Sequence, residues 1–220
     1  MKITQFDIPK NILEILQKQK IDDLRPSQYK AIEKGLFKNN NNLLVATPTG
    51  SGKTLVAELA LLDTIINKKK RVVYIVPLKA LASEKYREFI NLYNDYFKIR
   101  IAISEIQNEK YNYDYNIIIV TPEKLDSLIR HNKNFIDDVG LLIVDEIHLL
   151  NDEKRGPTLE IILTIFKSRY SSVRIIGLSA TIGNTEELSN WLEAILIEDD
   201  WRPVKLEQHV YFENKLLRYK

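Results

Sequence analysis

The chain has 220 residues, of which 45% are hydrophobic and 28% are charged, and its formal net charge is +2. This composition is that of an ordinary globular protein, and the length suits one large α/β domain or two small domains. The chain contains no cysteine, which excludes a disulfide framework, thiolate metal sites and cysteine nucleophiles.

The near-neutral charge gives no global sign of nucleic-acid binding, so any such binding must come from a local patch. The N-terminus lacks the basic-then-apolar profile of a secretory signal, and no apolar run is long enough to span a bilayer. We therefore expect a soluble, intracellular protein of the cytoplasm with no membrane partner.

Apolar runs typical of strands alternate with amphipathic patterns typical of helices along nearly the whole chain. Two helices are expected first, because Pro9 and Pro26 suit the first position of a helix and apolar residues follow each of them at helical spacing. The predicted strands are 43–46, 72–76, 99–103, 117–120, 141–144 and 175–178. The predicted helices that follow them are 55–66, 79–93, 122–130, 157–167 and 185–195. Residues 203–214 could form a final strand or begin a connection to a further segment.

This alternation predicts an α/β fold with three layers, in which helices cover both faces of a mostly parallel, doubly wound sheet. Ligands of such sheets bind beyond the C-terminal ends of the strands. The basic run at 68–71 precedes a strand and is interpreted as a solvated turn.

A glycine-rich segment, Ala-Thr-Pro-Thr-Gly-Ser-Gly-Lys-Thr at 46–54, lies between the first predicted strand and a predicted helix, which is the context of a P-loop. Backbone N–H groups there can cradle a triphosphate, because a helix N-terminus favours anions. The residues that would supply them are Thr49, Gly50, Ser51, Gly52, Lys53 and Thr54. Lys53 would reach the β- and γ-phosphates, and the Thr54 hydroxyl would bind Mg²⁺. The alternative is a glycine turn with no ligand, which the complete Gly-Ser-Gly-Lys-Thr string disfavours.

A second motif, Asp-Glu-Ile-His at 145–148, follows the apolar run at 141–144. A buried parallel strand would deliver these carboxylates at its C-terminal end. Asp145 would hold the magnesium shell, and Glu146 would orient and deprotonate the attacking water. The alternative is an acidic pair that only caps a helix. Together the two motifs predict ATP and Mg²⁺ as cofactors and Glu146, Asp145 and Lys53 as catalytic residues.

Six segments in order resemble the motifs of the superfamily 2 helicases, which implies a RecA-like P-loop NTPase domain. They are Arg-Pro-Ser-Gln at 25–28, the P-loop, Val-Pro-Leu-Lys-Ala-Leu at 76–81, Thr-Pro-Glu-Lys at 121–124, Asp-Glu-Ile-His at 145–148 and Ser-Ala-Thr at 179–181. The resemblance makes Arg25 and Gln28 nucleotide-binding residues, with Gln28 reading the adenine edge. The alternative for Gln28 is an ordinary helix-surface glutamine, and Phe6 is a candidate to cover the adenine face.

The same resemblance assigns nucleic-acid contacts and a coupling contact. Pro77, Lys79 and Thr121 would touch the sugar-phosphate backbone of the tracking strand. Thr-Pro-Glu-Lys also reads as a helix start with proline at its first position, and both interpretations can hold. His148 would bond to Ser179 and Thr181 and so couple the γ-phosphate state to domain movement, the alternative being a core histidine.

Local strings narrow the resemblance further. His148 in place of aspartate disfavours the DEAD-box branch, and the strings at 145–150, 155–160, 124–131 and 201–204 look like those of archaeal Hjm-type DNA helicases of the superkiller-related branch. Where that branch carries Gly-Asp, this chain reads Ser-Glu-Ile-Gln at 104–107, so a nucleic-acid contact is not carried over there. Nearby tyrosines could stack on bases or line a surface loop or edge strand. These are Tyr111, Tyr113 and Tyr115.

The resemblance implies an ATP-dependent 3′–5′ DNA helicase that acts on forked or branched DNA in replication-fork repair and recombination. We expect residues 1–203 to form the ATP-binding domain, with N-terminal helices for adenine, and residues 204–220 to lead toward a second RecA-like domain. Because that domain would supply arginine fingers, this chain alone should bind ATP with little hydrolysis. We expect it to be the N-terminal motor domain of a longer, monomeric protein with single-stranded or forked DNA as its partner. An RNA helicase of the same branch and an isolated nucleotide-binding module are the alternatives.

Overall fold

The structure is a computed structural model that describes residues 1–102, 114–132, 134–181, 183–207, 209–212 and 215–218. Its centre is a seven-stranded sheet in the order β3-β4-β2-β5-β6-β1-β7, and every neighbouring pair is parallel. The strands are β1 Asn42–Ala46, β2 Arg71–Ile75, β3 Ile99–Ala102, β4 Ile117–Val120, β5 Val139–Val144, β6 Arg174–Ser179 and β7 Ala194–Glu198. The six predicted strands and the parallel sheet are therefore confirmed.

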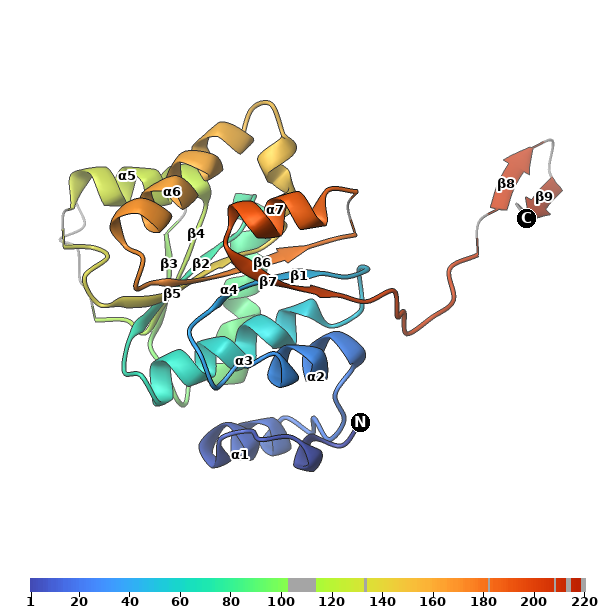
Figure 1. Ribbon diagram of the computed structural model, residues 1–220, viewed down its shortest axis with the longest axis horizontal. Helices are drawn as coiled ribbons and strands as arrows, with labels where there is room; N and C mark the ends of the chain where they lie inside the picture. Colours follow the sequence, from blue (N-terminus) through green and yellow to red (C-terminus); the bar gives the residue numbers. More distant parts are fainter. Residues whose placement is uncertain (103–113, 133, 182, 208, 213–214, 219–220) are drawn as a thin grey trace.

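Helices cover both faces of this sheet (Figure 1). The helices are α1 Lys10–Lys18, α2 Pro26–Glu33, α3 Lys53–Ile66, α4 Lys79–Tyr93, α5 Pro122–His131, α6 Gly156–Arg169 and α7 Thr185–Trp191. Two short 3₁₀ helices, η1 Ile3–Gln5 and η2 Ile147–Asn151, complete the helical elements that the structure describes.

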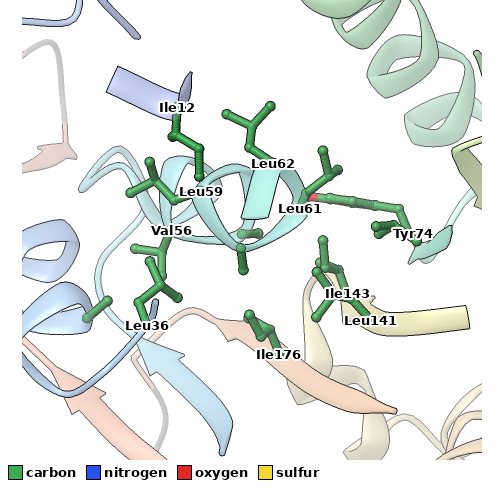
Figure 2. Close-up of a cluster of buried hydrophobic side chains, with 14 of the residues drawn as sticks. Ile12, Leu36, Val56, Leu59, Leu61, Leu62, Tyr74, Leu141, Ile143 and Ile176 are labelled. Atoms are coloured by element: carbon green, nitrogen blue, oxygen red, sulfur yellow. The ribbon is translucent and has the colours of Figure 1, made fainter. Parts of the chain in front are cut away.

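Two separate hydrophobic cores lie on the two faces because successive residues of a strand point to opposite sides. In β2, Tyr74 faces the core under α1–α4, whereas Val73 and Ile75 face the core under α5 and α6. Figure 2 shows Tyr74 and Ile143 in the first core together with Leu59 and Leu61 of α3. The strands thus read as continuous apolar runs, as expected of a sheet that is covered on both faces.

One predicted element is wrong in its second half. The helix expected at 185–195 ends at Trp191, and Ala194–Glu198 forms the edge strand β7, which pairs with β1. Glu193 between them has a φ of 51°, a left-handed conformation that ends the helix. The short apolar run that continues the helical spacing therefore belongs to a strand.

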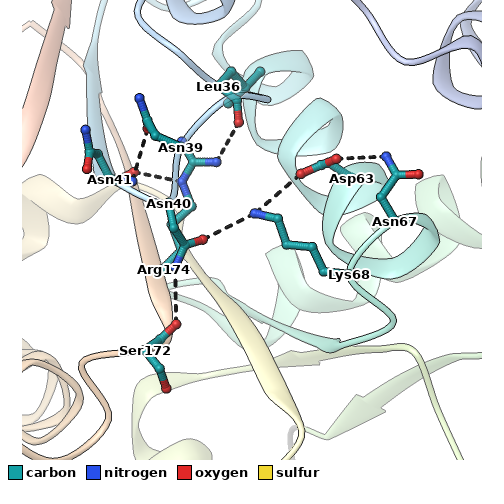
Figure 3. Close-up of polar contacts among 9 residues, drawn as sticks. All are labelled: Leu36, Asn39, Asn40, Asn41, Asp63, Asn67, Lys68, Ser172 and Arg174. Atoms are coloured by element: carbon teal, nitrogen blue, oxygen red, sulfur yellow. Dashed lines mark hydrogen bonds and ion pairs between the residues drawn. The ribbon is translucent and has the colours of Figure 1, made fainter.

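A polar network closes the N-terminal edge of the sheet (Figure 3). Arg174, only 1% exposed, donates from Nε to the Asn41 carbonyl and from Nη1 to the Leu36 carbonyl, both at 2.7 Å. Lys68 lies 3.4 Å from Asp63 and is exposed, so the predicted basic turn contributes an ion pair here. This edge is held by its own side chains and lies opposite the strand ends that carry the motifs.

The C-terminal segment leaves the sheet. Strands β8 His209–Phe212 and β9 Lys215–Arg218 form an antiparallel pair, which lies away from the main sheet in Figure 1. The final strand considered for 203–214 is thus present at 209–212, outside the main sheet. No helix in the ranges that the structure describes combines the length and the apolarity that crossing a bilayer requires.

Candidate active site

The sequence motifs meet at the C-terminal edge of the sheet. The P-loop follows β1 and the acidic motif follows β5, with β6 and its terminal Ser179 between them. Pro77 follows β2, and Thr121 follows β4. Since all these strands are parallel, the segments lie side by side at one edge, where ligands of such sheets bind.

The P-loop is closed by its own hydrogen bonds. Gly50 and Gly52 have φ angles of 81° and 94°, which favour glycine. The buried hydroxyls of Thr47 and Ser51 are 2.7 Å apart, and the Lys53 ammonium donates to the Thr47 carbonyl at 3.1 Å. These bonds shape the loop that ends in α3, whose N-terminus is the predicted phosphate cradle.

Arg25, which precedes α2, and Gln28, in the first turn of α2, hold the P-loop from outside. The Arg25 guanidinium donates to the Gly50 carbonyl at 2.6 Å, and Gln28 Nε2 donates to the Gly52 carbonyl at 3.0 Å. A Cβ at Gly52 would lie 2.3 Å from Gln28 Nε2, so this approach requires glycine. Gln28 is 3% exposed, which excludes the helix-surface alternative.

The role of Gln28 in reading adenine stays a prediction. Its Oε1 already accepts from the Arg25 N–H at 2.8 Å, so both ends of the amide are engaged within the chain. One N–H and one lone pair of that amide are left for a ligand. Phe6 stacks on Tyr29 with ring centroids 5.8 Å apart, so one of its faces is occupied by the protein.

A cavity of about 630 Å³ lies beside the P-loop. This volume is within the range of small-molecule sites. Gly52 and Thr54 line it together with Arg25 and Gln28. Its remaining walls come from the loop after α1, from α3 and from α4, including Asp22, Asp23, Glu58, Glu88 and Leu92.

Asp145 is held by two hydrogen bonds. Its Oδ2 accepts from the Tyr74 hydroxyl at 3.2 Å, and its Oδ1 accepts from the Glu146 N–H at 3.1 Å. Its own N–H donates to the Ile75 carbonyl, which continues the β5–β2 pairing by one residue. Burial raises the pKa of the Asp145 carboxyl, and the nearby Lys85 and the Tyr74 hydroxyl oppose that change. No sequence pattern indicates the contact between Tyr74 and Asp145.

Glu146 has a left-handed backbone, with φ 51° and ψ 47°. Such a conformation costs a residue other than glycine about 1–3 kcal/mol and is found most often at functional sites. The Glu146 carboxylate Oε2 lies 3.3 Å from the His148 Nδ1. No sequence pattern indicated this conformation.

The charges of the three predicted catalytic residues are coupled. Burial lowers the pKa of the Lys53 ammonium, and the charges of Glu146 and Asp145 oppose that change. The cation of the P-loop therefore feels both carboxylates of the motif that follows β5.

The coupling contact of His148 with Ser179 and Thr181 stays a prediction, and in this structure the His148 Nδ1 lies 3.3 Å from Glu146 Oε2. Ser179 is fully buried, and within the described part of the chain its hydroxyl has no hydrogen-bond partner. Thr181 is exposed. The His148 side chain is 32% exposed, which excludes the core-histidine alternative.

The predicted nucleic-acid residues differ in accessibility. Lys79 is exposed and begins α4, next to the exposed Leu78. Pro77 and Thr121 are buried, and the Thr121 hydroxyl accepts from the Lys124 N–H at 3.4 Å. The interpretation of Thr-Pro-Glu-Lys as a helix start is thus confirmed.

The tyrosine stretch is only partly described. Residues 104–107, Tyr111 and Tyr113 lie outside the described residues. Tyr115 is 6% exposed, and its ring lies 5.2 Å from the Arg71 guanidinium. Base stacking by Tyr115 is therefore contradicted, because the protein covers its ring.

The residues expected to hold magnesium supply the right atoms. Thr54 offers a hydroxyl and Asp145 a carboxylate, and Mg²⁺ in nucleotide sites uses one or two such protein oxygens with phosphates and water. Among the described residues, no group of three or more His, Cys, Asp or Glu side chains forms an all-protein metal cluster.

Comparison with known proteins agrees with this geometry. The family model described as DEAD/DEAH box helicase matches residues 25–188. Proteins named ATP-dependent DNA helicase Hel308 are 48% identical over 212 residues in Methanococcus vannielii and 52% identical over 206 residues in Methanocaldococcus jannaschii. The match covers 94% and 91% of this chain, but only 28% and 17% of those relatives. The Hel308 helicase of Pyrococcus abyssi is 46% identical over 214 residues, 97% of this chain and 29% of that relative.

Proposed function

This chain belongs to the DEAD/DEAH box helicase family, and we propose that it is the ATP-binding motor domain of an ATP-dependent DNA helicase. The observation that carries the proposal is that the P-loop with Lys53 follows β1 and the acidic motif with Asp145 and Glu146 follows β5, at the same C-terminal edge of one parallel sheet. The names of relatives that are 46–52% identical support DNA as the substrate.

In the proposed reaction the P-loop holds the triphosphate. The Lys53 ammonium, now bonded to the Thr47 carbonyl, would turn to the β- and γ-phosphates. Mg²⁺ would be held by the Thr54 hydroxyl and the Asp145 carboxylate, and it would neutralise charge on the phosphates. Glu146 would orient the attacking water and accept its proton, while His148 lies 3.3 Å from the same carboxylate.

The adenine base of ATP would lie in the cavity beside the P-loop. Gln28 lines that cavity and retains one donor and one acceptor for the adenine edge. Arg25 would support the same subsite through its bond to Gly50. The proposed adenine subsite therefore depends on the residues that also hold the loop in shape.

The nucleic acid would cross the C-terminal ends of β2 and β4. Lys79, exposed at the start of α4, is the proposed phosphate donor, and the segments at Pro77 and Thr121 would follow the backbone. We infer single-stranded or forked DNA and 3′–5′ movement, as in fork repair and recombination. Ser179 and Thr181 are the proposed partners of His148 once nucleotide and a second RecA-like domain are in place.

The chain spans 28% and 17% of the length of the first two relatives, so a whole helicase would contain much more protein. The test compares this chain with a longer protein that contains it. ATP hydrolysis and strand separation are measured with single-stranded DNA, with RNA and on forks with 3′ or 5′ tails. We expect DNA-stimulated hydrolysis and 3′-tail-dependent unwinding by the longer protein, with little of either by this chain. Stronger stimulation by RNA would reject DNA as the substrate, and vigorous hydrolysis by this chain alone would reject the need for a second domain.

A further inference from the structure

Behind the catalytic edge, one buried tyrosine points from the core to the acidic motif. Tyr74 is fully buried in β2, and its hydroxyl donates to Asp145 Oδ2 at 3.2 Å. Figure 2 shows its ring among the apolar side chains of the core. No helicase motif that the sequence revealed includes this residue.

Helix α4 fixes the tyrosine ring. The Lys85 ammonium lies 5.9 Å from the centre of the Tyr74 ring and 5.6 Å from that of Phe89. The Lys85 side chain is only 15% exposed, and Glu88 pairs with its ammonium at 2.6 Å. Phe89 meets Tyr74 edge-on, with ring centres 5.4 Å apart. A cation held over the face of an aromatic ring attracts it, so Lys85 restrains the ring from the side of α4.

We propose that Tyr74 and Lys85 are positioning residues for the carboxylate of Asp145, Tyr74 by its hydrogen bond to Oδ2 and Lys85 by holding the Tyr74 ring. This inference rests on the proposed function, in which Asp145 binds magnesium. The Tyr74 hydroxyl and the Glu146 N–H each use one site of the carboxylate, which fixes its plane and leaves lone pairs on both oxygens. Partners that orient a ligand in this way typically change metal affinity 10- to 100-fold.

The same helix supplies a matched control. Tyr93 of α4 is also fully buried and also meets Phe89 edge-on, with ring centres 5.7 Å apart. Its hydroxyl donates at 2.6 Å to Glu58 and not to Asp145. Tyr74→Phe and Tyr93→Phe therefore each remove one buried hydroxyl from the same core. Only the Tyr74 hydroxyl contacts Asp145.

The experiment measures binding of a fluorescent ADP to this chain, first in EDTA and then over a titration of Mg²⁺. For Tyr74→Phe we expect the Mg²⁺ concentration at half-saturation to rise about tenfold, with the affinity in EDTA unchanged. Lys85→Met should raise that concentration, and Lys85→Arg, which keeps the charge over the ring, should restore it. Tyr93→Phe should leave it as in the wild type.

The thermal unfolding midpoint of each variant shows whether it is folded. An equal Mg²⁺ requirement for folded Tyr74→Phe, Tyr93→Phe and wild type would overturn the positioning role while leaving the proposed function intact. A wild-type chain that binds the nucleotide with no dependence on Mg²⁺ would overturn the magnesium site itself, and the positioning role with it.

Discussion

The Glu146 carboxylate lies 3.3 Å from the His148 imidazole, and a left-handed backbone at Glu146 brings the two together. A glutamate held in a costly conformation at a strand end fits a base that must be aimed. We predict that Glu146→Gln keeps the nucleotide affinity of this chain. It should lower hydrolysis by the longer protein about 10²- to 10⁴-fold, because the amide cannot accept the proton of water.

Fluorescent nucleotide binding and steady-state phosphate release measure the two parts of that prediction. Glu160→Gln, an exposed position on α6, is the control for the amide change. ATP hydrolysis by Glu146→Gln at the wild-type rate would refute the role of Glu146 as the base that activates water.

Lys53 is the second residue whose role can be measured. Its ammonium is partly buried against the Thr47 carbonyl and near two carboxylates, so a triphosphate would replace a weak partner with a strong one. We predict that Lys53→Ala weakens ATP binding at least about tenfold, because a phosphate buried without its cation is costly. Calorimetric titration of this chain measures the affinity. Lys10→Ala, an exposed lysine of α1, should bind ATP normally, and equal affinities of the two variants would contradict the assignment.

Much of the fold and of the site could be predicted because the signals are local. The strands around the P-loop are apolar runs buried on both faces, and the motifs follow them directly. Strand β7 was not predicted because its apolar residues continue the helical spacing of α7. Only the left-handed backbone of Glu193 separates the two elements. Pairing with β1, a contact distant in sequence, decides its state.

The side-chain contacts of the site could not be predicted, because they too join residues that are distant in sequence. Tyr74 is 71 residues away from Asp145 in sequence, and a tyrosine inside an apolar strand is indistinguishable from an ordinary core residue. The alternating tyrosines left base stacking and a surface loop or edge strand both open, and only the fold shows that the Tyr115 ring is buried beside Arg71. The approach of the His148 imidazole to Glu146 likewise depends on the backbone conformation of Glu146, which no sequence pattern indicates.

Gln28 lines the nucleotide cavity and also bonds to the P-loop, and one substitution removes its amide donor while it keeps the other oxygen in place. Gln28→Glu keeps the size of the side chain but replaces the Nε2 donor with an oxygen that faces the Gly52 carbonyl. We predict a loss of about 1–3 kcal/mol in the free energy of unfolding, because the half-buried carbonyl loses its partner and meets a charge. ATP affinity should fall with it, together with the preference for ATP over GTP.

Urea unfolding and competition binding with ATP and GTP measure these effects. Gln17→Glu, an exposed glutamine of α1, is the matched control. A stable Gln28→Glu variant that still prefers ATP to GTP would show that the glutamine neither holds the loop nor reads the base.

Glu58 predicts how stability depends on pH. Its carboxyl is 6% exposed and accepts from the Tyr93 hydroxyl at 2.6 Å. Burial raises the pKa of Glu58 from its ordinary 4.5 to about 7; Glu88 adds to that rise, while Lys85 and the Tyr93 hydroxyl oppose it. The folded chain therefore binds this proton more tightly than the unfolded chain. The resulting stabilisation is complete below about pH 4.5 and is lost as the pH rises through 7.

The free energy that Glu58 contributes between these limits is on the order of 3 kcal/mol. Glu58→Gln keeps an acceptor for the Tyr93 hydroxyl but binds no proton. This variant should therefore be more stable than the wild type at pH 8, and its free energy of unfolding should decrease less between pH 5 and pH 8. Urea unfolding at both pH values measures this, with Glu160→Gln as the exposed control. If Glu58→Gln and Glu160→Gln lose the same stability between pH 5 and pH 8, Glu58 is ionised in the folded chain at both pH values and the predicted linkage is absent.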